Sequence, residues 1–288
     1  MKRHATHGRR PEPARRASQR SIRDALITPR ARPLVKPANL LGWLFVLLVI
    51  GLAETLVRLF DLGDSVPAPT ATLGALVHET RSGTLAGEIG ATVESYAQGL
   101  AIAVVLGVTV GVLIGSSRTL LDASHLLIEF LRPIPAVSVI PLAVFFFGFG
   151  VPMRRWIVAY AALWPILMNA LYGARGVDRV LHDVARTSCV GWLGRLVRVT
   201  LPAALPSIAT GIRVSASIGL LVAVTAEWVS GTDGVGAYMQ RQENAVQLPE
   251  LYAAVVLVGA LGYAVNRGLR ATERRLVFWT GEQRLHEP

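Results

Sequence analysis

The stretch Asp183–Pro206 reads DVARTSCVGWLGRLVRVTLPAALP and lies between two long apolar segments of the chain. It carries three arginines and one aspartate, so it is more polar than either neighbour. We expect Leu201-Pro202 to end a short helix here, because a proline removes a backbone donor from a helix interior. The apolar positions that predict this helix share one face: Leu193, Leu196 and Val197.

A helix this short does not fold alone, since nucleating a helix is costly and its stability comes from packing. It therefore needs the next apolar segment beneath it and a further packing surface above it. Pro206 is expected near the start of that next segment, where a missing backbone donor costs little.

The composition points to a membrane. Of the 288 residues, 52% are hydrophobic and 17% are charged, whereas soluble domains are about 25% charged. The single cysteine excludes an intrachain disulfide and a cysteine-based metal cluster. The sequence has no G-x-x-x-x-G-K-[ST] loop for a nucleotide and no G-x-S-x-G nucleophile motif, so we predict a chain that is not an enzyme and holds no cofactor.

Six segments are long and apolar enough to cross about 30 Å of hydrocarbon. We predict an all-α integral membrane protein with a transmembrane domain at 38–275, a disordered basic tail at 1–37 and a short tail at 276–288. The predicted spans are about 40–60, 89–114, 123–147, 156–172, 207–229 and 251–269.

The basic residues predict the orientation. Most of the 29 Lys and Arg residues lie in the amino-terminal tail, in the segment 175–198 and after residue 266. Six spans put these segments on one side, and Lys and Arg favour the cytoplasm. We therefore expect both termini and the 176–206 loop in the cytoplasm, with Arg154-Arg155 as a local exception. We expect the tail to contact membrane lipids and to bind no nucleic acid.

The third span contains EFLRPIPAVSVIPLAVFFFGFG, Glu129–Gly150, whose prolines predict a broken helix. Such a break at membrane depth is tolerated only where protein or a water-filled cavity satisfies the backbone. We consider structural pairing, gating and anion contact for Glu129 and Arg132, and gating or helix packing for Glu227. The candidate residues for a translocation path or gate are Glu129, Arg132, Pro133, Pro135, Pro141, Asn169 and Glu227.

Glycines recur every fourth residue in the second span, at Gly107, Gly111 and Gly115. Small residues at this spacing let helices approach closely in lipid, so we expect tight packing there. The alternative is that glycine is simply frequent in membrane helices.

The cytoplasmic stretch resembles the coupling loop of the permease family of bacterial ABC importers. That loop has Glu-Ala-Ala, then three residues, then Gly, and later Leu-Pro. In this sequence the Glu-Ala-Ala triplet is replaced by Asp183-Val184-Ala185 and the glycine by Cys189, while Leu201-Pro202 matches the Leu-Pro pair. Three further stretches are similar to segments of one branch of this permease family, which transports sulfonates, taurine, nitrate and bicarbonate. They are Glu129–Gly150, Leu201–Val229 and Ser230–Gln240, which reads SGTDGVGAYMQ.

Cys189 departs from the family pattern. If the glycine position needs a positive φ, cysteine is a poor substitute, and the turn is then rebuilt with Gly191 or coupling is weaker. The resemblance covers about Leu40–Arg275 and implies the fold of a type I ABC importer permease.

The resemblance also implies partners: a second permease copy, two cytoplasmic ATPases that bind ATP and Mg, and an external binding protein that delivers a small anionic solute. A helix within Val184–Leu196 would insert into a groove on the ATPase. The residues implied in this coupling are Asp183, Val184, Ala185, Arg186, Cys189, Gly191, Leu193, Leu196, Leu201 and Pro202.

Two other classes of function stay open. A self-sufficient secondary transporter would show internal repeats and intramembrane acids for ion coupling, and no clear repeat is seen. A membrane-anchored regulatory or nucleic-acid-binding protein would use the basic tail.

Overall fold

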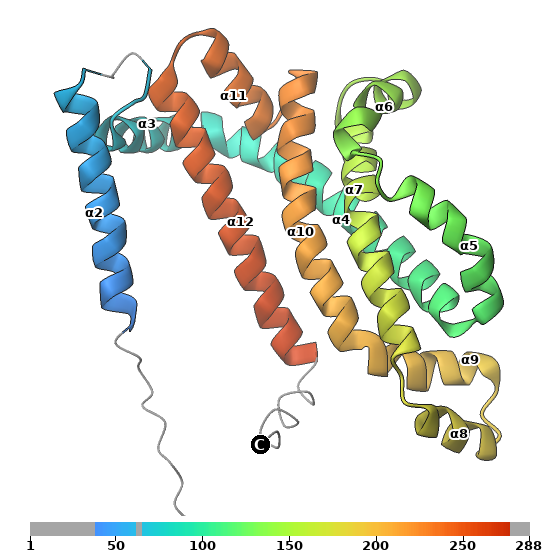
Figure 1. Ribbon diagram of the computed structural model, residues 1–288. Helices are drawn as coiled ribbons and strands as arrows, with labels where there is room; N and C mark the ends of the chain where they lie inside the picture. Colours follow the sequence, from blue (N-terminus) through green and yellow to red (C-terminus); the bar gives the residue numbers. More distant parts are fainter. Residues whose placement is uncertain (1–37, 62–64, 277–288) are drawn as a thin grey trace, which may run out of the picture. The chain divides into compact units, whose positions relative to one another are not determined.

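The computed structural model describes residues 38–61 and 65–276, and these residues are helical with no β-strand (Figure 1). The tail predicted at 1–37 lies outside the described residues, as does the tail predicted at 276–288 apart from Leu276, the last residue of α12. The helices are α2 (Ala38–Leu59), α3 (Pro69–Ser82), α4 (Thr84–Ser116), α5 (Arg118–Leu131), η2 (Ala136–Val139), α6 (Ile140–Phe147), α7 (Val151–Arg175), α8 (Arg179–Thr187), α9 (Trp192–Arg195), η3 (Leu196–Thr200), α10 (Leu201–Ser230), α11 (Val235–Asn244) and α12 (Leu248–Leu276).

The chain divides into two compact units, Met1–Gly51 and Leu52–Pro288. In the first unit, the described residues form the beginning of α2, and its large apolar side chains from Trp43 to Ile50 are exposed. In the second unit, α7 packs against both α4 and α10, and Figure 1 shows α4 crossing behind them. Lipid is the solvent that suits such exposed apolar helices.

Five of the described helical segments are long and apolar enough to cross a membrane: Gly42–Leu59, Thr84–Ser116, Val151–Arg175, Trp192–Ser230 and Leu248–Arg275. A sixth crossing is made if α5 and the η2–α6 segment form one broken span, since they pass the same test together but bend by 85°. The prediction of an all-α membrane protein is confirmed.

The close packing predicted from the glycines of α4 is confirmed. A Cβ added at Gly111 would lie 2.6 Å from the carbonyl oxygen of Leu167, and one at Gly115 would lie 2.5 Å from that of Leu171. Both contacts are to the backbone of α7, which cannot yield as a flexible side chain can. The glycines therefore fix the distance between α4 and α7.

Candidate functional site

The stretch between the membrane helices α7 and α10 folds as a helical hairpin, which we call the coupling hairpin and define as residues 177–203. Its first helix, α8, begins after Asp178, whose side chain accepts a hydrogen bond of 2.9 Å from the Val180 amide. The expectation of one helix within Val184–Leu196 is wrong, because α8 ends at Thr187 and a turn separates it from α9.

The turn is a left-handed helix cap. The Cys189 amide donates to the Arg186 carbonyl and the Val190 amide donates to the Ala185 carbonyl, both at 3.0 Å. Cys189 has φ +55°, whereas Gly191 has φ −60°. These paired bonds are the Schellman pattern, in which glycine is the usual residue at the left-handed position. The turn is thus not rebuilt with Gly191, and Cys189 itself adopts the conformation that suits glycine.

Replacing Cys189 with glycine is expected to stabilise the hairpin by about 1 kcal/mol, because a side chain in the left-handed region clashes with its own backbone. Cys189→Ala is the matched control, since it removes the thiol but keeps the Cβ, and no gain is expected. Amide hydrogen exchange at Val190 measures the effect. Equal protection in the glycine and alanine variants would contradict it.

The second arm of the hairpin runs directly into the membrane helix. The expectation that Leu201-Pro202 ends a helix is wrong, because α9, η3 and α10 are consecutive and form one apolar segment, Trp192–Ser230. η3 is a π-helical turn in which the Leu201 amide bonds to the Leu196 carbonyl. This wider turn accommodates Pro202, which lacks an amide hydrogen. Pro206 likewise lies inside α10, not at its start.

The two faces of α8 differ, and each borders a groove. The apolar groove has a volume of about 510 Å³ and is lined by Leu181, Val184, Ala185, Ser188, Val190, Arg198, Val199, Pro202 and Ala203. The basic groove has a volume of about 410 Å³ and is lined by Ser116, Arg179, His182, Asp183, Arg186, Trp192, Arg195, Leu196 and Thr200.

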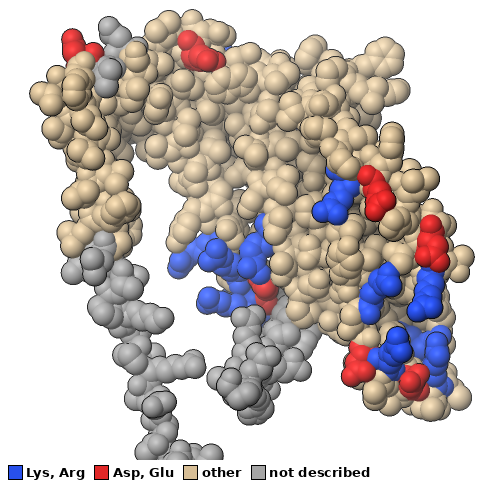
Figure 2. Space-filling model, in the orientation of Figure 1, with Lys and Arg blue, Asp and Glu red and all other residues tan. Residues whose placement is uncertain are grey.

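The hairpin lies at one end of the bundle, away from α11 (Figure 1). Figure 2 shows Arg side chains gathered at this end, over the hairpin and the carboxyl end of α12. Val184 is 57% exposed, Leu193 is 64% exposed and Trp192 is 54% exposed. A cluster of large apolar side chains beside many charges is typical of a protein interaction site.

Three of the predicted path residues border one cavity. Glu129, Arg132 and Pro133 line a space of about 770 Å³ between α5 and the carboxyl-terminal part of α7. Glu129 pairs with His125 one turn earlier on α5, at 3.4 Å. The cavity is also lined by Leu121, His125, Ile128, Met168, Leu171, Tyr172 and Arg175.

At the break between α5 and α6 a protein side chain bonds to the freed backbone, which is one of the two alternatives that the sequence left open. Pro135 cannot donate to the Leu131 carbonyl, which lies four residues earlier. The Tyr160 hydroxyl of α7 donates to that carbonyl at 3.0 Å. Pro141 lies in the first turn of α6, where its missing donor costs little.

Asn169 lies at the interface of α7 and α10. Its side-chain amide donates to the Pro165 carbonyl at 2.8 Å, and its backbone carbonyl accepts a hydrogen bond of 2.8 Å from the Ser207 hydroxyl. A Cβ added at Gly211 of α10 would lie 2.7 Å from the Asn169 Cβ. Asn169 is half-buried, and its observed contacts are helix-packing contacts.

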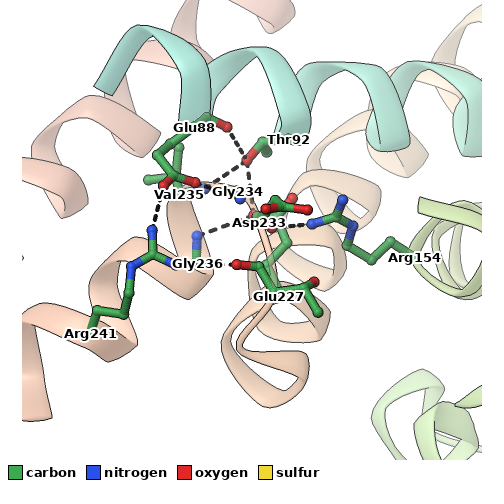
Figure 3. A network of polar contacts seen from close by, with 10 residues as sticks. Glu88, Thr92, Arg154, Glu227, Asp233, Gly234, Val235, Gly236 and Arg241 are labelled. Atoms are coloured by element: carbon green, nitrogen blue, oxygen red, sulfur yellow. Dashed lines mark hydrogen bonds and ion pairs between the residues drawn. The ribbon is translucent and has the colours of Figure 1, made fainter. Parts of the chain in front are cut away.

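Glu227 is buried at the other end of α10, within a polar network that joins α4, α10 and α11 (Figure 3). Its Oε2 accepts hydrogen bonds from the Thr92 hydroxyl at 2.8 Å and from the Gly236 amide at 3.1 Å. The Val235 amide in turn donates to the Thr92 hydroxyl at 2.9 Å. Glu227 therefore accepts at the amino end of α11, where backbone amides have no partner within the helix.

Charged residues extend this network on both sides. Glu88 accepts from the Gly234 amide at 2.7 Å and pairs with Arg241, while the fully buried Arg154 donates to the Asp233 carbonyl (Figure 3). The sequence reasoning did not identify Glu88, Thr92 or Arg154 as parts of a site. One signal was available: Arg154 belongs to the dipeptide that breaks the charge rule, and its burial explains that exception.

The chain matches known proteins over most of its length. The family model described as "Binding-protein-dependent transport system inner membrane component" matches residues 103–277. A protein of Bacillus subtilis that carries the name aliphatic sulfonates transport permease protein SsuC is 31% identical over 217 residues, which cover 74% of this chain and 78% of that protein.

Two further relatives are similar. The taurine transport system permease protein TauC of Escherichia coli is 32% identical over 62% of this chain and 66% of its own length. The bicarbonate transport system permease protein CmpB of Synechococcus elongatus is 33% identical over 62% of this chain and 64% of its own length. These matches do not favour the alternative of a self-sufficient secondary transporter. The chain belongs to the family of binding-protein-dependent transport system inner membrane components, the permease subunits of ABC importers.

Proposed function

We propose that the coupling hairpin is the element through which a partner ATPase drives this permease. The observation that carries the proposal is the apolar groove of the hairpin, bordered by the half-exposed Val184 and Leu181. Such a surface on the basic, membrane-external end of the bundle requires a protein partner. The ATPase would bind ATP and Mg and carry out hydrolysis, while this chain would hold no cofactor and perform no catalysis.

The proposed assembly has two ATPases, two copies of this permease and an external binding protein. Both termini and the hairpin would face the cytoplasm, because the basic residues concentrate at that end. The residues expected in coupling would act as parts of this hairpin, with Cys189 in the turn after α8 and Leu201-Pro202 joining the hairpin to α10 instead of ending a helix.

The continuous helix suggests how movement would reach the far end of the membrane. The helix α10 is 30 residues long, about 45 Å at 1.5 Å per residue, and it follows α9 without a break, although Figure 1 shows α9 turned away from its axis. A displacement of the hairpin by the ATPase would tilt α10 as a rigid body and move Glu227 together with α11. This is a switch between two arrangements of packed helices, which ATP biases by its different affinity for each.

The proposed solute is a small anion of the sulfonate, taurine, nitrate or bicarbonate class. The names of the relatives support it, since they specify aliphatic sulfonates, taurine and bicarbonate. The cavity beside the broken helix also supports it, because Arg132, Arg175 and His125 border it against a single carboxylate, Glu129. Along this proposed path Pro133, Pro135 and Pro141 would break the helix, and Asn169 and Glu227 would hold the surrounding helices.

Replacing Val184 with aspartate tests the docking proposal. We expect at least a tenfold loss of ATPase co-purification with the detergent-solubilised permease, because an unpaired carboxylate in an apolar interface costs several kcal/mol. Thr187→Asp adds the same charge one turn later, at an exposed position that borders neither groove, and should retain the ATPase. Normal membrane insertion with undiminished co-purification in Val184→Asp would refute the proposal.

A further inference from the structure

The basic groove lies on the face of α8 opposite to the apolar groove. Arg179, His182, Asp183 and Arg186 border it from α8, and their spacing puts them on one helix face. Arg195 borders it from α9, and Trp192 and Leu196 supply an apolar wall. The groove is thus a concave site built by both arms of the hairpin.

Its arginines are without partners. Among the described residues, the side chains of Arg179, Arg186 and Arg195 make no hydrogen bond or ion pair, although Asp183 borders the same groove. By contrast, Arg213 pairs with Glu273 at 2.5 Å, so arginines near this end of the bundle do find carboxylates where these are in reach. Three arginines therefore border this hollow against one carboxylate, Asp183, and an anion bound there would offset their excess positive charge.

We propose that the basic groove binds a small oxyanion of the sulfate, phosphate or sulfonate class. A guanidinium group presents planar donors that match such oxygens, and charge-assisted bonds of this kind are stronger than neutral ones. The volume of about 410 Å³ lies in the range of small-molecule sites. It leaves room for a short carbon chain against Trp192 and Leu196.

The ligand would bridge α8 and α9, because its arginine partners lie on both helices. It would therefore stiffen the hairpin on the side away from the apolar groove. If the hairpin docks an ATPase, as proposed above, the bound anion would change the affinity of that docking, and the ATPase would change the affinity for the anion by the same factor. Binding of the anion to the permease itself does not depend on the docking proposal.

Equilibrium dialysis of the purified full-length permease with radiolabelled sulfate tests the site. Unlabelled phosphate, methanesulfonate and chloride at equal ionic strength are the competitors. We expect phosphate or methanesulfonate, but not chloride, to displace the labelled sulfate. Whichever of the two displaces it more strongly shows whether the groove prefers inorganic oxyanions or sulfonates. Arg195→Gln and Arg179→Gln should each weaken sulfate binding about tenfold, the effect of losing one charge-assisted hydrogen bond.

Arg198→Gln is the matched control. Arg198 lies within one turn of Arg195 but borders the apolar groove, so the same loss of charge should change sulfate affinity less than twofold. Chloride competition equal to that of phosphate, or equal weakening by Arg198→Gln and Arg195→Gln, would overturn the proposal. A third result would also overturn it: the unmodified permease binds no sulfate, while Arg195→Gln loses ATPase co-purification. The groove would then bind acidic side chains of the partner instead of a small anion.

Discussion

Replacing Gly111 with alanine is expected to destabilise the folded permease by about 1–3 kcal/mol, the usual cost of adding atoms to a filled interface. The new Cβ would lie 2.6 Å from the Leu167 carbonyl oxygen and 2.7 Å from the Ala170 Cβ. Neither neighbour is the end of a flexible side chain, so α4 and α7 would have to separate along their length. Thermal unfolding in detergent, followed by tryptophan fluorescence, measures the loss.

Gly90 supplies the control on the same helix. A Cβ added there meets nothing within 4 Å, so Gly90→Ala should leave stability unchanged or raise it by about 0.5–1 kcal/mol through the helix preference of alanine. If the two alanine variants unfold at the same temperature, the glycines of α4 do not set its distance from α7.

Replacing Glu227 with alanine should cost about 2–4 kcal/mol, because it leaves buried donors without an acceptor and Arg154 without a nearby negative charge. The Gly236 amide loses its 3.1 Å bond and the Thr92 hydroxyl loses its 2.8 Å bond. The amino end of α11 would then detach from α10. Hydrogen exchange at the Gly236 amide reports this detachment directly.

Glu227→Gln separates the hydrogen bonds from the charge. The side-chain oxygen of the glutamine can still accept a hydrogen bond from the Gly236 backbone amide. The Gly236 amide should therefore keep most of its protection from hydrogen exchange in Glu227→Gln and lose it in Glu227→Ala. Full protection of Gly236 in Glu227→Ala would show that the network does not hold α11.

The helical architecture was predictable because apolar length and glycine spacing are local properties of the sequence. The positions of Gly107, Gly111 and Gly115 indicated a close helix contact, and the structure identifies α7 as the partner helix. The family resemblance drew attention to the segment between two membrane helices, which the structure shows as a helical hairpin. It also identified Cys189 as the position where a positive φ would be unusual.

The remaining features depend on contacts between distant residues. Leu201-Pro202 was expected to end a helix because an α-helix cannot accept proline without losing a bond, but a π turn absorbs the loss. The Tyr160 hydroxyl that caps the broken helix comes from a separate helix. Likewise, the bond between Thr92 and Glu227 joins residues 135 positions apart, which no pattern within one segment reveals.

Labelling of Cys189 tests the central claim that the hairpin faces the cytoplasm and is covered by an ATPase. Cys189 is exposed, and it is the sole cysteine in the sequence, so the unmodified chain reports one site. A membrane-impermeant maleimide should label it in inside-out vesicles stripped of the ATPase, should fail to label it in intact cells, and should lose access when purified ATPase is added back. Labelling from the outside of intact cells, or labelling in vesicles that the ATPase does not diminish, would contradict the account.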